Sequence, residues 1–167
     1  PSTVLEAGQK LEIVRNTKTD FKHQHPEKNR PVVIKFEDDH FIVAIKPVGI
    51  LSCKSDEQRG IAFDQILKEY ISKRDSVKTQ LWIAHRIDRE VEGLIIFAKT
   101  EEVQKQLKDD WKNVTKKYLA LTEGNPTPAS GTIESWLKDG HNHQMVVFQK
   151  EVQGSQFAKT EYKVLEQ

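Results

Sequence analysis

Apolar residues in the first half of the chain gather in short runs that are separated by polar turns. Val32–Phe36 and Phe41–Ile45 are rich in β-branched and aromatic residues, and residues 37–40 between them are polar. This pattern favours two strands joined by a turn. Leu81–Ile87 and Leu94–Ala98 have the same strand character. We therefore predict four strands between residues 32 and 98.

Two longer segments repeat their apolar residues at helical spacing. Gly60–Arg74 predicts one helix, with an apolar stripe formed by Ile66, Leu67, Tyr70 and Ile71. Thr100 is a suitable N-cap for a second helix, because acidic residues follow it in the first turn. The core-facing stripe of that second helix would be Val103, Leu107 and Trp111.

The last third of the chain is dominated by strand-like runs. We predict strands at Lys117–Thr122, Gly131–Leu137, Gln144–Phe148 and Lys159–Leu165. The final three have no helix between them, so antiparallel neighbours are expected. The predicted class is α+β, with a mixed, mainly antiparallel sheet and flanking helices.

The first 31 residues differ from the rest. Gly8–Val14 predicts a short strand, and residues 16–30 form a polar stretch typical of a linker. We expect compact structure to begin near Val32.

Composition narrows the function classes further. The chain has 167 residues and a formal net charge of +1, so any affinity for nucleic acid must come from local patches. Cys53 is the single cysteine, which excludes an internal disulfide and favours a reducing, cytoplasmic setting. No apolar run reaches the roughly 20 residues of a membrane-spanning helix.

Charged residues are dense in residues 85–93, between two predicted strands. Alternation along the first strand places Arg86 and Asp88 on one face, and His85 and Ile87 on the other. Arg86 and Asp88 are therefore able to face one cleft. From the residues alone, an exposed salt-bridged turn is the commoner explanation.

Residues 85–100 read His-Arg-Ile-Asp-Arg-Glu-Val-Glu-Gly-Leu-Ile-Ile-Phe-Ala-Lys-Thr. This stretch resembles the signature of the ribosomal-large-subunit (RluA-like) branch of the pseudouridine synthases. The Lys-Pro-Val-Gly bend at residues 46–49, and residues 117–121 and 158–165, resemble other segments of that family. The resemblance covers residues 32–167, as the N-terminal part of the catalytic domain. Residues 1–31 in turn resemble the tail of an S4-like RNA-binding domain followed by a linker.

The resemblance implies a function and a set of site residues. Asp88 would be the catalytic nucleophile that isomerises uridine to pseudouridine in structured rRNA or tRNA. Arg86 would help to hold the flipped-out nucleotide, and Tyr118 would stack on the base; without the resemblance, Tyr118 would be interpreted as a core residue. His85 is expected to be structural and hydrogen-bonded. No cofactor, membrane or DNA partner is implied.

A basic stretch offers a candidate RNA contact. Lys105, Lys108 and Lys112 are expected to share one helical face that follows RNA phosphates, although a merely solvated face is an equal alternative. His141 and His143 are spaced like metal ligands. No carboxylate or thiol stands near them at ligand spacing, so we predict no metal site.

The chain departs from the family pattern at two places. Glu92 occupies the position of a small serine in the signature. The family's third motif, with the basic partner of the aspartate, lies beyond Gln167, so we expect the chain to be truncated, and the isolated fragment need not be active. The alternatives are a non-catalytic RNA-binding module that keeps the fold and, more distantly, a carboxylate-dependent hydrolase.

Overall fold

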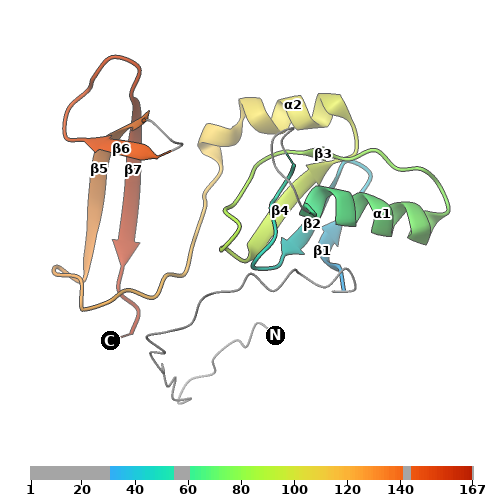
Figure 1. Ribbon diagram of the computed structural model, residues 1–167, viewed down its shortest axis with the longest axis horizontal. Coiled ribbons are helices and arrows are strands. Elements are labelled where there is room, and N and C mark those ends of the chain that lie inside the picture. The colour runs from blue at the N-terminus through green and yellow to red at the C-terminus, as the bar shows by residue number, and fades with distance from the viewer. Residues whose placement is uncertain (1–30, 55–60, 141–143, 167) are drawn as a thin grey trace. The chain divides into compact units, whose positions relative to one another are not determined.

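The computed structural model describes residues 31–54, 61–140 and 144–166, which form two compact units (Figure 1). The first unit ends at Thr115 and the second begins at Lys116. The strand and linker expected before residue 31 lie outside the described residues. In the part of the chain that is described, no helix is long and apolar enough to cross a membrane.

The first unit is built on a four-stranded antiparallel sheet in the order β1-β2-β4-β3. The strands are β1 (Val33–Glu37), β2 (Phe41–Lys46), β3 (Trp82–Ile83) and β4 (Gly93–Ala98). β2 and β4 pair along their whole lengths, with Ile42 opposite Phe97 and Ala44 opposite Ile95. The predicted strands are confirmed except at β3, which is much shorter than expected.

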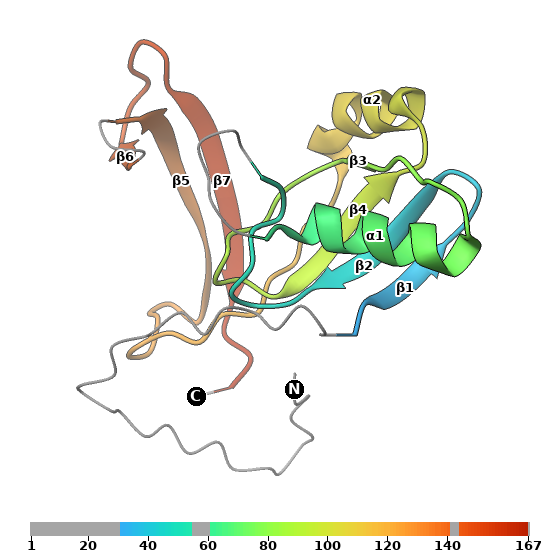
Figure 2. The ribbon, with the colours of Figure 1, turned by 45° about the vertical axis from the view of Figure 1, so that its right-hand side comes forward.

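Helix α1 (Phe63–Asp75) covers one face of this sheet (Figure 2). Its buried residues Phe63, Leu67 and Ile71 recur at intervals of four, as an amphipathic helix requires. Of the predicted stripe, Ile66, Leu67 and Ile71 face the core, whereas Tyr70 is exposed and its assignment to the stripe is wrong. They pack on the residues of β2 and β4 that alternation turns inward, namely Ile42, Ala44, Ile95 and Phe97. This cluster is the hydrophobic core that positions the loops at the ends of the strands.

Helix α2 (Glu101–Asp109) begins where Thr100 predicts it. The Thr100 hydroxyl accepts a hydrogen bond from the Val103 amide at 3.3 Å, as an N-cap does. α2 ends earlier than its apolar stripe suggests, because Trp111–Asn113 forms the short 3-10 helix η1. The expectation that Lys112 continues the same α-helical face is therefore wrong.

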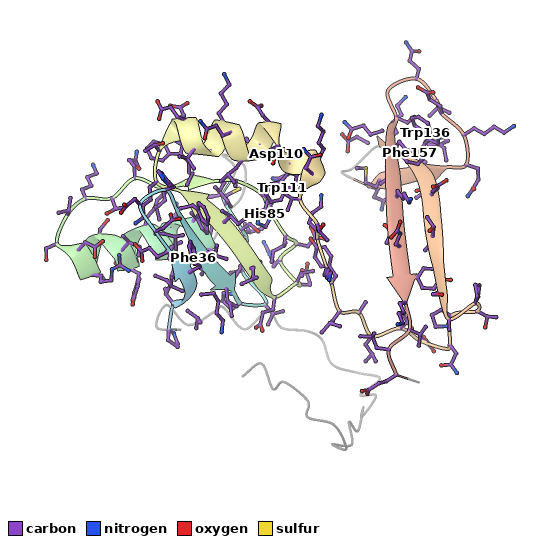
Figure 3. All side chains as sticks on the ribbon, turned by 180° about the vertical axis from the view of Figure 1, so that it is seen from behind. Phe36, His85, Asp110, Trp111, Trp136 and Phe157 are labelled. Carbon is purple, nitrogen blue, oxygen red and sulfur yellow. The ribbon has the colours of Figure 1, made fainter. Side chains whose placement is uncertain are left out.

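The second unit is a three-stranded antiparallel sheet in the order β6-β5-β7. Its strands are β5 (Ser130–Asp139), β6 (Met145–Phe148) and β7 (Gln156–Lys163). Trp136 and Phe157 meet edge to face across β5 and β7, with ring centroids 5.4 Å apart (Figure 3). Helices and mainly antiparallel strands confirm the α+β class, although the described strands form two sheets instead of one.

The strand predicted at residues 117–122 is wrong. This segment forms no regular element and belongs to no described sheet, and Leu119 is 89% exposed. A strand-like sequence becomes a strand only when a neighbouring strand supplies hydrogen bonds and a packing surface. No such neighbour pairs with the segment among the described residues.

Glu37 at the end of β1 links three elements of the first unit. Its carboxylate accepts two hydrogen bonds from the Arg74 guanidinium of α1, at 2.6 and 2.9 Å, and one from Lys99 Nζ after β4, at 2.9 Å. The hydrogen bonds from Arg74, reinforced by Lys99 against the effect of burial, lower the pKa of Glu37 from 4.5 to about 2. The ionised carboxylate therefore stabilises the folded unit.

We expect Glu37→Gln to lower the free energy of unfolding at pH 7 by about 1 kcal/mol, since a partly exposed ion-pair network is lost. The folded pKa lies below the ordinary value, so this stabilisation is full above pH 4.5 and disappears as the pH falls towards about 2. Urea titrations across that interval should show the two proteins converging. Glu69→Gln, which breaks an exposed pair with Lys73, is the control with a smaller effect. A difference that does not change with pH would contradict the account.

Candidate active site

The charged segment predicted to carry chemistry lies between β3 and β4. Arg86 and Asp88 are exposed, whereas His85 and Ile87 are half-buried, so the predicted alternation of faces is confirmed. The Ile87 side chain packs against the hydrophobic core. Asp88 then opens a turn, in which its carbonyl accepts a hydrogen bond from the Val91 amide at 3.2 Å. The carboxylate thus stands at the surface, directly after a residue that is anchored in the core.

The backbone on both sides of Asp88 is held by one segment, residues 46–52, which we call the anchor segment. Before Asp88, the Ser52 hydroxyl donates to the Ile87 carbonyl at 2.5 Å and accepts from the Ile87 amide at 3.0 Å. After Asp88, the Arg89 carbonyl accepts from the Gly49 amide at 2.7 Å and from Lys46 Nζ at 3.2 Å. The anchor segment therefore holds the Ile87–Asp88 peptide before Asp88 and the Arg89–Glu90 peptide after it.

Lys46 is fully buried at the end of β2, on the inward face of the strand. Its ammonium donates to three carbonyl oxygens, those of Pro47 at 3.0 Å, Ile50 at 2.9 Å and Arg89 at 3.2 Å. All three protons of the ammonium are thereby satisfied, which a buried charge requires.

Burial lowers the pKa of Lys46, and nearby carboxylates oppose that shift. The carboxylates belong to Glu90, Asp88 and Glu92, in decreasing order of effect. The acidic residues of the charged segment therefore stabilise the charged form of Lys46, and the ammonium of Lys46 binds the Arg89 carbonyl in the same segment. Glu92, which departs from the family signature, is exposed and contributes to this balance.

Gly49 gives the anchor segment its shape. Its φ of 90° lies in the left-handed region, which favours glycine over every other residue. This conformation turns the chain after Pro47 so that the Gly49 amide faces the Arg89 carbonyl. The Lys-Pro-x-Gly bend thus has a structural purpose, since it brings the amide and the ammonium to one acceptor.

His85 is hydrogen-bonded and turned away from Asp88, as expected. Its Nε2 accepts a hydrogen bond from the Ile96 amide of β4 at 3.3 Å. The imidazole also stacks on Trp111 of η1, with ring centroids 4.5 Å apart (Figure 3). His85 therefore connects β4 to η1, which is a structural role.

The His85 bond also explains why β3 is shorter than predicted. The ladder continues for one residue beyond the strand, with the Ala84 amide donating to the Ile96 carbonyl at 2.9 Å. The Ile96 amide then binds the imidazole instead of a backbone carbonyl, and Ile87 binds a serine hydroxyl. Side chains therefore replace the regular strand ladder as the chain approaches Asp88.

The three lysines proposed to contact RNA are exposed. Lys105 and Lys108 lie on α2, and Lys112 lies on η1. Lys105 and Lys108 border a shallow surface hollow whose lining also includes Gln104, Glu101, Glu102 and Asp109. Acidic side chains are therefore interspersed with the lysines on α2.

Tyr118 belongs to the second unit, and its side chain is 66% exposed on the segment that precedes β5. An exposed ring on an unpaired segment is not the core tyrosine that the residues alone favour. Its phenol is accessible to a ligand that approaches the second unit.

No group of three or more His, Cys, Asp or Glu side chains is placed to hold a metal ion in the ranges that the structure describes. His141 and His143 lie outside those ranges. Cys53 is half-buried with a free thiol.

Sequence reasoning did not assign roles to Lys46 or Ser52. Lys46 carries a signal that identifies it: it follows Ile42 and Ala44 at alternate positions of one strand, so it must point into the core. A lysine at an inward position needs acceptors and predicts an organised site. Ser52 carries no such signal, because its partner is 35 residues away in the sequence.

Comparison with known proteins identifies the class of protein that this fold and site define. The family model described as RNA pseudouridylate synthase matches residues 40–167. The chain belongs to this family.

Among its relatives, an uncharacterized RNA pseudouridine synthase of Mycoplasma genitalium is 36% identical over 116 residues, which cover 65% of this chain and 36% of the relative. The dual-specificity RNA pseudouridine synthase RluA of Escherichia coli is 29% identical over 152 residues, which cover 87% of this chain and 64% of the relative. This chain therefore spans less than two thirds of the length of either relative.

Solved structures show the same fold. The human protein RNA Pseudouridylate Synthase Domain Containing 4 superposes with a TM-score of 0.64 at 23% identity. That match covers 80% of this chain and 53% of the human one. The pseudouridine-synthase-like fold expected from the sequence is confirmed.

We expect Lys46→Met to destabilise the first unit by roughly 2–4 kcal/mol, because buried carbonyl oxygens lose their donor. Lys105→Met is the matched control: it removes an exposed ammonium and should change the free energy of unfolding by less than about 0.5 kcal/mol. Urea unfolding followed by tryptophan fluorescence measures both. Equal, small effects of the two substitutions would show that the buried ammonium does not stabilise the fold.

Proposed function

We propose that this chain carries the catalytic aspartate of an RNA pseudouridine synthase, which isomerises uridine in structured ribosomal or transfer RNA. Membership of the family supports the reaction class. The observation that carries the proposal for Asp88 is its setting: an exposed carboxylate between two anchored peptide groups. The backbone that carries the reacting carboxylate is therefore already ordered when the substrate binds.

The reaction needs little besides a well-placed carboxylate. The bond between uracil N1 and ribose C1′ breaks, and a bond between uracil C5 and C1′ forms. The proton on C5 is lost, and N1 gains a proton, so the product is an isomer of the substrate. A carboxylate suits a sugar centre that becomes electron-poor as the base leaves, either by attacking that centre or by assisting proton loss. The balance involves no oxidant or reductant, and therefore the proposal requires no cofactor.

A uridine in folded RNA must leave its stack before Asp88 can reach its sugar, at a cost of a few kcal/mol. Arg86 stands two residues before Asp88 and is exposed as Asp88 is. We assign Arg86 to holding the displaced nucleotide, because a guanidinium pairs with phosphate and with base edges. We assign Tyr118 to stacking on the uracil, because its ring is exposed and stacking tolerates any base.

Lys105, Lys108 and Lys112 are the proposed contacts to RNA phosphates. All three are exposed, and ammonium groups on a surface release counterions when they neutralise phosphate. The neighbouring acidic residues on α2 reduce the local positive potential. These lysines would therefore guide RNA onto the surface and leave specificity to the residues around Asp88.

We expect Asp88→Asn to lower the rate of pseudouridine formation by about a thousandfold or more while RNA binding persists, since the amide keeps the shape but loses the nucleophile. Unmodified transcripts of ribosomal and transfer RNA serve as substrates, and the nucleosides are quantified by chromatography after digestion. Asp39→Asn is the control, because it removes an exposed carboxylate at the end of β2 opposite to the anchor segment. Full activity in Asp88→Asn would exclude Asp88 as the nucleophile. Binding without product in the full-length protein would instead favour a non-catalytic RNA-binding module.

Replacing Lys105, Lys108 and Lys112 together by Gln should weaken RNA binding and reduce the slope of log K against log salt by about 2–3, or nearly one per phosphate contact. The matched control replaces three exposed lysines outside α2 and η1, namely Lys35, Lys73 and Lys78. Filter binding at a series of salt concentrations measures both triples. Equal slopes for the two triples would show that the proposed surface has no special contact with RNA.

A further inference from the structure

The Ser52 hydroxyl is buried and is bound to one residue that is distant in the sequence. Ser52 is 4% exposed, and its hydroxyl makes two hydrogen bonds to a single residue, Ile87. The hydroxyl donates a hydrogen bond to the Ile87 carbonyl and accepts one from the Ile87 amide, so it acts as donor and as acceptor to the same residue. In a sheet these two backbone groups would bind a neighbouring strand. Here one side chain from 35 residues away replaces that strand.

The hydroxyl is itself fixed, because the backbone of Ser52 is bound to helix α1. The Ser52 carbonyl accepts from the Asp64 amide at 3.2 Å, and the Leu51 carbonyl accepts from the Phe63 amide at 2.8 Å. Both amides belong to the first turn of α1, where helix donors need acceptors from outside the helix. α1 is in turn held by the hydrophobic core. A rigid path therefore leads from the core to the peptide before Asp88.

The Asp88 side chain has no comparable support of its own. Among the described residues, no hydrogen bond or ion pair holds its carboxylate, and the side chain is exposed. Its direction therefore depends on its backbone. The peptide on one side is fixed by Ser52, and the carbonyl of Arg89 on the other side is fixed by Gly49 and Lys46.

We propose that Ser52 is a positioning residue for the reaction, and that its hydroxyl sets the direction of the Asp88 carboxylate through the backbone of Ile87. This inference rests on the proposed role of Asp88. Loss of the hydroxyl frees the Ile87 peptide, so the carboxylate samples a wider range of positions. A misplacement of about 1 Å at a reacting group costs as much as 100-fold in rate.

Ser52→Thr and Ser52→Val form the decisive pair, because the two side chains have the same shape and differ only in the hydroxyl. Both side chains add the same bulk at the buried position, so a difference between their kcat values reports the loss of the hydrogen bonds alone. We expect kcat for Val to be at least about tenfold below kcat for Thr, with the same KM for RNA. Rates are referred to the folded fraction, which thermal unfolding of each variant defines. Equal kcat for Thr and Val would overturn the proposal.

Ser155 provides the matched control within the same chain. Its hydroxyl binds one residue in the same double manner, donating to the Val152 carbonyl at 2.7 Å and accepting from the Val152 amide at 3.0 Å. Ser155→Val should change stability without changing kcat of the folded protein. A fall in kcat as large as that of Ser52→Val would show that loss of any such hydroxyl has the same effect, and would overturn the proposal.

Amide hydrogen exchange at Ile87 tests the anchor without relying on catalysis. The Ile87 amide should exchange at least about tenfold faster in Ser52→Val than in Ser52→Thr, since only Thr retains the acceptor. Faster exchange in Ser52→Val with the same kcat as Ser52→Thr would overturn the claim that Ser52 positions Asp88 for the reaction. Equal exchange in both variants would overturn the anchor itself. If the full-length protein forms no pseudouridine, the proposed function fails, while the exchange rates still decide whether Ser52 holds Ile87.

Discussion

The peptide groups on both sides of Asp88 are bound by residues 46–52, and the other features of the site depend on this interaction. The Ser52 hydroxyl takes both polar groups of Ile87, while the Gly49 amide and the Lys46 ammonium share the Arg89 carbonyl. Ser52 is bound to the first turn of α1, and Lys46 is the last residue of β2. The sheet and the helix thus converge on three consecutive residues. This construction allows an exposed carboxylate to be well placed without contacts that would block a substrate.

The same interaction explains the unusual burial of a lysine. A buried ammonium costs free energy unless all of its protons find acceptors. Lys46 has three carbonyl acceptors, and the carboxylates of Glu90, Asp88 and Glu92 offset the effect of burial on its pKa. Two of those carbonyls belong to the anchor segment itself, and the third follows Asp88. The charge therefore organises the turn on which the proposed chemistry depends.

Local patterns were sufficient to predict the elements that have a clear period or cap. The alternation in β2, the fourfold spacing in α1 and the Thr100 cap of α2 all follow from neighbouring residues. The outward direction of Asp88 followed from alternation as well. Residues 117–122 failed this reasoning, because strand-like residues need a partner that local pattern does not reveal. The role of Ser52 could not be predicted from local pattern for a related reason: its contact with Ile87 exists only after β2, α1 and β4 have packed together.

The most direct test of the central claim is tritium release from RNA labelled at uridine C5. Formation of a bond between C5 and ribose replaces the hydrogen at C5, so a synthase must release one tritium for each pseudouridine. For the full-length protein, the account predicts release from ribosomal or transfer RNA transcripts in proportion to the pseudouridine recovered. Stable binding of these RNAs without tritium release would contradict it.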